Sequence, residues 1–151
     1  MTMQVRQWMT HPAISVRPHD SAAYARAIME EHRINQLPVL NGPRLVGIVS
    51  DRDLRDALPS LAESMTAPLS GWGPIAIPVE EMMTHDVLTV EPDSSLAEAA
   101  RLLRDERIGA LPVVSGGHLV GILARSDLLE ALVALLAGAR RSAQTQGSIT
   151  G

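Results

Sequence analysis

The chain contains no cysteine and no phenylalanine, and Trp8, Tyr24 and Trp72 are its only aromatic residues. Without cysteine, neither a disulfide framework nor a thiolate metal site can form. The shortage of aromatic rings argues against a surface on which nucleic-acid bases stack. Alanine, valine, isoleucine and leucine supply most of the apolar surface instead, which favours aliphatic packing of helices on a sheet.

Positive charge and long apolar runs are also scarce. The formal net charge is -4 and the basic residues are scattered, so the electrostatic footprint of a nucleic-acid-binding protein is missing. The longest mainly hydrophobic stretch, Leu128 to Ala137, is too short to span a bilayer. We therefore expect a cytoplasmic protein that binds neither nucleic acid nor membrane.

The sequence repeats itself without a gap. Val5 to Leu58 aligns with Val79 to Leu132, and roughly two residues in five are identical between the copies. Met9-Thr10-His11 returns as Met83-Thr84-His85, and Leu45-Val46-Gly47-Ile48 returns as Leu119-Val120-Gly121-Ile122. Two small units related by a pseudo-twofold axis are expected, and any site at their junction should exist in two related versions.

Each copy predicts the same β-α-β-β-α unit, so the fold class is α/β (α+β). The expected strands and helices, first copy then second, are strands 13–16 and 87–90, helices 22–32 and 96–106, strands 37–40 and 111–114, strands 45–49 and 119–123, and helices that begin near Asp51 and Ser126. Ser21 and Ser95 are the expected N-caps. The expected domains are 1–58 and 79–138, joined by a Pro- and Gly-rich linker over 59–78 and followed by a disordered tail over 139–151.

The junction between the last strand and the following helix carries the most informative polar residues. Ser50 and Asp53 stand there in the first copy, and Asp127 stands there in the second. The free backbone N–H groups of a first helical turn bind anions or polar ligands. A carboxylate at the same point can accept hydrogen bonds from two ribose hydroxyls, each worth about 1.5 to 3 kcal/mol.

These duplicated motifs resemble the cystathionine-β-synthase (CBS) domain, in the tandem arrangement called a Bateman module. The shared pattern is Met-Thr, then Val-x-Pro, then Arg-Ile-x-x-Leu-Pro-Val, then Leu-Val-Gly-Ile-x-x-x-x-Asp-Leu, and it occurs twice. The resemblance implies two units packed through their sheets, with adenosine-containing ligands bound in the cleft between them. Ser50 and Asp53 match the family's Ser/Thr-x-x-Asp motif, whereas the second copy has Ala124 in place of the hydroxyl, with Ser126 as a substitute from the adjacent turn.

The resemblance implies a wider set of ligand-binding residues. Besides the junction residues, these are Arg33, Arg107, Asn35, Gln36, Arg52, Ile14, Thr89, and the two Leu-Pro-Val segments Leu37, Pro38, Val39 and Leu111, Pro112, Val113. Arg33 and Arg107 precede Leu-Pro-Val, where relatives contact phosphates, and Arg52 is a further candidate. The neutral residues that follow the two arginines weaken the case for a triphosphate such as ATP, whereas AMP, ADP or S-adenosylmethionine would need less positive charge, and all four compounds stay candidates.

Simpler interpretations exist for each feature. Asp53 and Asp127 could have no role beyond complementing a helix dipole at the helix N-terminus. Arg33 and Arg107 could likewise do no more than complement a dipole at a helix C-terminus. His11 and His85 recur at equivalent positions, but neither has a second ligand one helical turn away, so no metal site is predicted.

We predict a regulatory module rather than an enzyme, because no nucleophile paired with a base and no phosphate-binding glycine loop is present. An adenine nucleotide or S-adenosylmethionine would act as effector, no cofactor is required, and an unknown partner protein would read the rearrangement. A homodimer is also expected, through helices such as the one from Asp127 to Ala139. The alternative is a structural or oligomerisation module that binds partners without a ligand.

Overall fold

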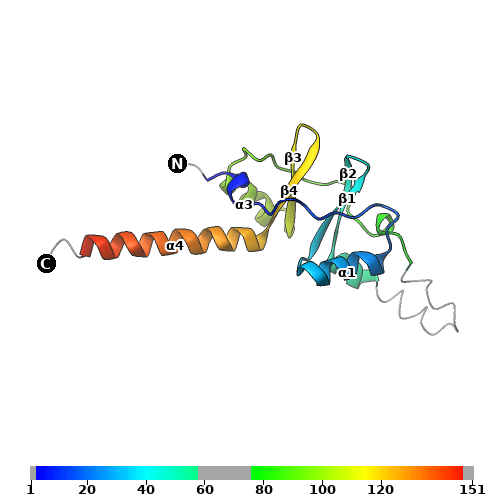
Figure 1. Ribbon diagram of the computed structural model, residues 1–151, viewed down its shortest axis with the longest axis horizontal. Helices are drawn as coiled ribbons and strands as arrows, with labels where there is room; N and C mark the ends of the chain where they lie inside the picture. The colour runs from blue at the N-terminus through cyan, green and yellow to red at the C-terminus, as the bar shows by residue number, and fades with distance from the viewer. Residues whose placement is uncertain (1–2, 58–75, 148–151) are drawn as a thin grey trace.

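The structure, a computed structural model, describes residues 3–57 and 76–147 (Figure 1). In chain order its elements are the 3-10 turn η1 (Val5–Gln7), α1 (Ala22–His32), β1 (Gln36–Asn41), β2 (Arg44–Ser50), a helix over 51–57, η2 (Val79–Glu81), α3 (Leu96–Asp105), β3 (Ala110–Ser115), β4 (His118–Ala124) and α4 (Arg125–Gly147). The predicted α1 and α3 and the four hairpin strands are confirmed to within one residue at either end. Most of the predicted linker lies outside the described residues.

The helix starts follow from local capping. The Ser21 hydroxyl accepts the Tyr24 N–H at 3.1 Å, and the Ser95 hydroxyl accepts the Glu98 N–H at 3.4 Å. Each bond satisfies a backbone donor that has no partner inside the helix. Both predicted N-caps are therefore confirmed.

Each half contains an antiparallel hairpin, β1 with β2 and β3 with β4. The predicted strands 13–16 and 87–90 are wrong, because each is reduced to one parallel bridge, Val16 with Val39 and Val90 with Val113. The Val16 N–H donates to the Pro38 carbonyl at 3.1 Å, but proline has no N–H to continue the ladder. Pro112 limits the second half in the same way.

The two cores are built by exchange of segments between the halves. Val5 is fully buried in the core of the second half, and Val79 is fully buried in the core of the first. The Val5 N–H donates to the Ser94 carbonyl at 3.0 Å, and the Val79 N–H donates to the Asp20 carbonyl at 2.8 Å. The sequence repeats therefore do not coincide with the spatial units.

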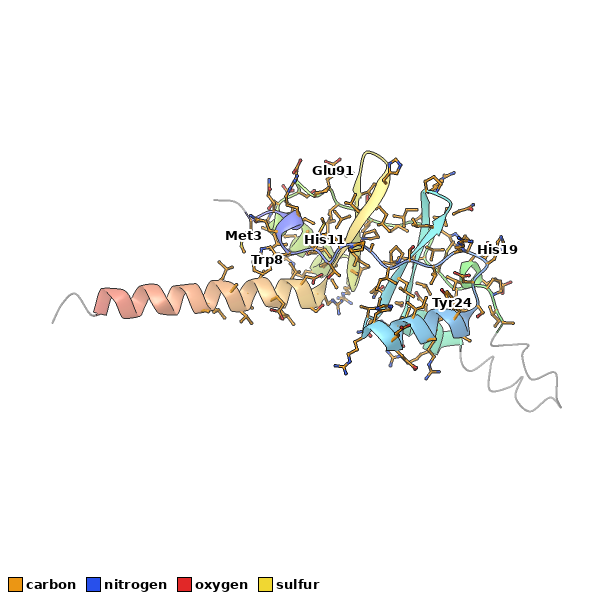
Figure 2. All side chains as sticks on the ribbon, in the orientation of Figure 1. Met3, Trp8, His11, His19, Tyr24 and Glu91 are labelled. Carbon is orange, nitrogen blue, oxygen red and sulfur yellow. The ribbon has the colours of Figure 1, made fainter. Side chains whose placement is uncertain are left out.

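The figures show the same exchange. Met3 and Trp8 lie beside the second half, whereas Tyr24 and His19 lie on the first (Figure 2). The segment that carries His11 crosses between the halves (Figure 2). The halves touch through strands β2 and β4. They are also joined by the chain itself, because a segment that belongs to each repeat packs in the core of the other half.

Helix α4 extends away from the two units (Figure 1). The helix runs into the predicted tail, which begins at residue 139, and ends at Gly147. Its first three turns carry several apolar side chains on the surface, namely Leu129, Leu132, Val133, Leu135 and Leu136. None of the helices within the described residues combines the length and apolarity needed to cross a membrane.

Candidate functional site

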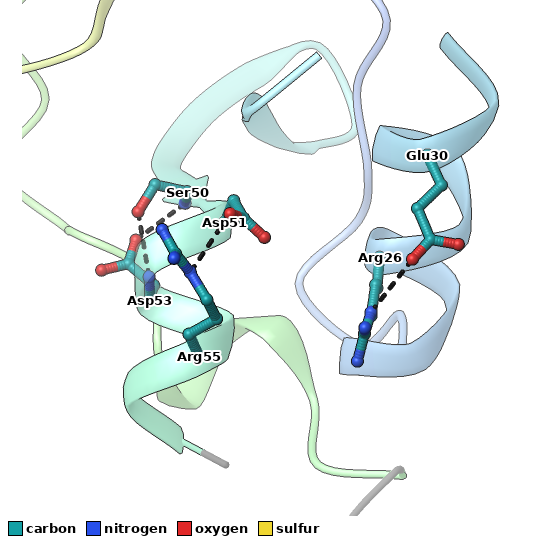
Figure 3. Close-up of polar contacts among 6 residues, drawn as sticks. All are labelled: Arg26, Glu30, Ser50, Asp51, Asp53 and Arg55. Atoms are coloured by element: carbon teal, nitrogen blue, oxygen red, sulfur yellow. Dashed lines mark hydrogen bonds and ion pairs between the residues drawn. The ribbon is translucent and has the colours of Figure 1, made fainter. Parts of the chain in front are cut away.

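Ser50 and Asp53 form a reciprocal cap where β2 runs into the helix over 51–57 (Figure 3). The Ser50 hydroxyl accepts the Asp53 N–H at 3.0 Å, and Asp53 Oδ2 accepts the Ser50 N–H at 2.8 Å. This is a capping box, which fixes the rotamers of both side chains. Among the described residues Asp53 Oδ1 has no hydrogen-bond donor, so one carboxylate oxygen remains available at the strand end.

Asp51 ties the same junction to its surroundings. Its N–H donates to the Asn35 carbonyl at 2.8 Å, which fastens the helix start to the residue before β1. Its Oδ2 lies 3.2 Å from Nε of Arg55, one turn further along the helix (Figure 3). The pairing compensates the charge of Arg55, which is therefore less available to a ligand.

A cleft of about 440 Å³ opens at this junction and has walls from both halves. Its lining is Asn35, Gln36, Ile48, Ser50, Asp51, Arg52, Asp53 and Arg55 from the first sequence repeat, and Thr84, Asp86, Val87, Leu88, Glu106, Arg107, Ile108, Gly109, Ala110 and Arg125 from the second. Because the walls come from both repeats, a ligand here would contact both at once.

The charges in the cleft are mixed. Besides the Asp51–Arg55 pair, Arg125 donates from Nε to the Ile108 carbonyl at 3.2 Å. Arg52 and Arg107 remain as cations without a recorded side-chain partner among the described residues, and Asp86 and Glu106 lie on the same lining. The cleft is thus not strongly basic.

Arg107 and Arg33 occupy equivalent positions with an unusual backbone. Both have φ of 54°, in the left-handed region, which costs a residue with a Cβ roughly 1 to 2 kcal/mol. Arg33 ends α1, where its N–H bonds to carbonyls of the last turn. A glycine would adopt this conformation without the cost, so arginine at both positions is consistent with a role for the side chain.

The second copy builds a different junction. Asp127 Oδ2 accepts the Ala124 N–H at 2.8 Å, as in the first copy, but Ala124 has no hydroxyl to complete the capping box. Asp127 Oδ1 instead accepts the hydroxyl of Thr10 at 3.2 Å. Ser126 is exposed and makes no recorded side-chain hydrogen bond within residues 3–57 and 76–147, so no substitution for the missing hydroxyl is seen.

The structure brings six of the predicted site residues together on the cleft, namely Asn35, Gln36, Ser50, Arg52, Asp53 and Arg107. The others lie off its lining. The two Leu-Pro-Val segments are buried, with their leucines and valines in the two cores. Ile14 packs against the first core, while Thr89, Arg33 and Ser126 are exposed.

Sequence reasoning missed the contribution of the segment that enters the second half. Thr84, Asp86 and Leu88 line the cleft beside Ser50 and Asp53, although they lie far away in sequence. Thr84 is placed there by reciprocal backbone bonds with Ile48 of 2.9 and 3.0 Å. The repeated Met-Thr motif was the signal, but its cross-half pairing was not visible in it.

No cluster of three or more histidine and carboxylate side chains suited to a metal ion occurs in the parts of the chain that the structure describes. His11 lies on the crossing segment, apart from His19 (Figure 2).

The fold and the site together define a duplicated α/β module with a cleft between its repeats. A family model described as "CBS domain" matches the chain twice, over residues 5–60 and 79–134. The chain belongs to this family, as a tandem CBS (Bateman) module.

Curated relatives share the repeats but differ in length. The CBS domain-containing protein YhcV of Bacillus subtilis (strain 168) is 31% identical over 124 residues, which are 82% of this chain and 81% of YhcV. Inosine-5'-monophosphate dehydrogenase of Korarchaeum cryptofilum is 34% identical over 126 residues, 83% of this chain, yet this chain spans only 23% of that enzyme.

Two solved structures that resemble this fold contain adenosyl compounds. The CBS domain pair of protein MJ0100, in complex with 5'-methylthioadenosine and S-adenosyl-L-methionine, has a TM-score of 0.76 and 25% identity, with 89% of this chain and 98% of that chain covered. CBSX2 in complex with AMP has a TM-score of 0.71 and 31% identity, with 87% of this chain and 97% of that chain covered.

Proposed function

We propose that this chain is a regulatory module that binds an adenosine-containing ligand in the cleft beside Asp53. The observation that carries the proposal is the capped Asp53 carboxylate, which keeps one oxygen available on the lining of a cleft shared by both halves. Adenosyl compounds in the related CBS pairs of MJ0100 and CBSX2 support the ligand class. The module is a sensor and not an enzyme under this proposal.

The charges of the cleft favour ligands with little negative charge. Arg52 and Arg107 are opposed by Asp86 and Glu106 on the same lining. Arg55 is paired with Asp51, and this pairing reduces the positive electrostatic potential that would attract a polyphosphate. AMP or S-adenosylmethionine should therefore bind more tightly than ATP.

Regulation follows from the position of the cleft. A ligand that contacts Asp53 in the first half and Arg107 in the second favours the arrangement in which those walls are close. A partner protein that distinguishes the arrangements would read the occupancy of the cleft. Hydrogen exchange should slow at residues 84–88 on addition of AMP or S-adenosylmethionine, whichever compound binds.

The test is calorimetric titration of AMP, ADP, ATP and S-adenosylmethionine into the wild type and into Asp53→Asn. The amide oxygen of asparagine still accepts the Ser50 N–H, but its NH₂ group does not accept a ribose hydroxyl. Loss of a charge-assisted bond worth about 1.5 to 3 kcal/mol predicts affinity about 10- to 150-fold lower. The matched control is Asp56→Asn, an exposed carboxylate on the same helix but off the cleft lining, which should bind like the wild type.

Unchanged affinity in Asp53→Asn would refute the ribose clamp, and absence of binding by all four compounds would refute the sensor. In that second case the alternative gains weight, because one observation favours it independently. Leu129, Val133 and Leu136 on α4 are 62%, 63% and 57% exposed, an apolar stripe at helical spacing. We propose that this stripe pairs two copies of the chain.

The dimer is tested by light scattering on the double variant Val133→Asp, Leu136→Asp. Two charges in an apolar interface should convert a dimer to a monomer, because each buried carboxylate loses its hydration. Glu130→Gln on the same helix is the control and should leave the mass unchanged. Equal masses for the wild type and the double variant would contradict the interface.

A further inference from the structure

Asp53 and Asp127, the carboxylates at the two strand–helix junctions, differ in the hydrogen bonding of their Oδ1 atoms. Asp127 Oδ1 accepts the Thr10 hydroxyl at 3.2 Å, so both of its oxygens have protein donors. Asp53 accepts the Ser50 N–H on Oδ2, and its Oδ1 has no donor in the parts of the chain that the structure describes. The difference concerns the atom that the proposed function assigns to a ribose hydroxyl.

The backbone places the two threonines equivalently. Thr10 exchanges hydrogen bonds with Ile122 at 2.9 and 3.0 Å, and Thr84 exchanges them with Ile48 at 2.9 and 3.0 Å. Each threonine is therefore paired with the isoleucine that stands at the same sequence separation before the junction aspartate. The contrast lies in the side chains, because Thr10 donates to an aspartate and, among the described residues, Thr84 does not.

Neighbouring substitutions separate the sites further. Ala124 replaces Ser50 at the strand end, so the second carboxylate lacks the hydroxyl half of the capping box. Asp86 and Arg55 line the cleft beside Asp53, and the repeat aligns them with Pro12 and Leu129. Two polar groups of that lining therefore have no polar counterpart in the other repeat.

We propose that Thr10 holds Asp127 in the place of a ribose hydroxyl, so that the module takes one adenosyl ligand per chain, at Asp53. This proposal rests on the proposed function, and it makes Thr10 the residue that decides which of the two related sites is open. A ligand at Asp127 must first break a hydrogen bond to a carboxylate, whereas a ligand at Asp53 breaks none. The second site is therefore self-occupied, and its affinity is lower by the strength of that bond.

The experiment compares Thr10→Val with Thr10→Ser. Valine keeps the branched shape and removes the donor, while serine keeps the donor. Titration with AMP and with S-adenosylmethionine should give one equivalent for the wild type and for Thr10→Ser. Thr10→Val should bind a second equivalent at ligand concentrations where the wild type binds one, because loss of one competing hydrogen bond should raise the affinity of the Asp127 site about tenfold. Asp127→Asn added to Thr10→Val should abolish the gain.

A second readout needs no ligand. Thermal unfolding of Thr10→Val, Asp127→Ala and their combination should give midpoint shifts that are not additive, because both changes remove the same bond. Thr10→Ser should unfold close to the wild type.

Additive shifts would overturn the proposal, because the contact would then contribute nothing. Two equivalents in the wild type would also overturn it, and if Thr10→Val then lost the second equivalent, Thr10 would be a ligand contact. One equivalent in the wild type that Thr10→Val leaves unchanged refutes the proposal and retains the proposed function. No binding by any variant refutes the proposed function, and the proposal falls with it.

Discussion

The exchange of segments predicts which substitutions are coupled energetically. Val79 belongs to the second repeat in sequence but is buried in the first core, in the same cluster as Val39. Val113 is the counterpart of Val39 and lies in the other core. Two residues that share a cluster should show coupled effects on stability, and two residues in separate clusters should not.

The magnitude follows from the atoms removed. Val79→Ala deletes two methyl groups from a side chain with no exposed surface, which costs about 1.6 kcal/mol at about 0.8 kcal/mol for each buried group. The cavity left in the core raises the loss of unfolding free energy to roughly 2 to 3 kcal/mol. For a chain of this length, the midpoint of thermal unfolding should fall by roughly 4 to 12 °C.

The assay is urea unfolding of Val79→Ala combined with either Val39→Ala or Val113→Ala. The first pair should deviate from additivity by about 0.5 kcal/mol or more, and the second should be additive within about 0.5 kcal/mol. The two partner substitutions are chemically identical and both sites are fully buried, so they are matched controls. Coupling of Val79 to Val113 in place of Val39 would refute the exchanged arrangement.

Further predictions concern the caps and the two glycines of the Leu-Val-Gly-Ile motifs. Ser50→Ala should lower the unfolding free energy by about 0.5 to 2 kcal/mol, because the Asp53 N–H loses its acceptor. Ala124→Ser should stabilise the chain by up to about 1 kcal/mol, by completing the capping box at Asp127, and an unchanged denaturation midpoint would show that the hydroxyl does not reach. Gly121→Ala should destabilise by about 1 to 3 kcal/mol, because its Cβ would stand 2.9 Å from the Thr10 carbonyl oxygen of the crossing backbone. Gly47→Ala should cost less, because its Cβ meets mainly the movable side chain of Met83, and the reverse order in urea unfolding would contradict this account.

The elements of this fold could be predicted because their signals are local. Ser21 and Ser95 mark helix starts, and the hairpins follow from apolar runs interrupted at Gly42 and at Gly116-Gly117, whose positive φ angles suit tight turns. The prediction of strands over 13–16 and 87–90 was wrong for a non-local reason. The neighbouring strand places Pro38 or Pro112, which has no N–H to donate, opposite each segment, and the local pattern does not show this.

The exchange between halves could not be predicted because the repeat hides it. Val5 and Val79 are equivalent by sequence, so each fits the pattern of either core, and only the path of the chain decides. The same exchange explains why only part of the site could be predicted. Asp53 and Ser50 carry their motif locally, but Thr84 and Asp86 reach the cleft only through that exchange.

The exchange also gives the cleft its connection to the rest of the molecule. One continuous segment packs Val79 in the first core, pairs Thr84 with Ile48, and then places Asp86 on the cleft. Asp53 reaches the same cleft from the end of the strand that contains Ile48. A ligand held by Asp53 and Asp86 would therefore connect two segments that already share a core and a backbone pairing. Its binding should oppose separation of the second half from the first, because that separation would require residues 77–84 to leave the first core.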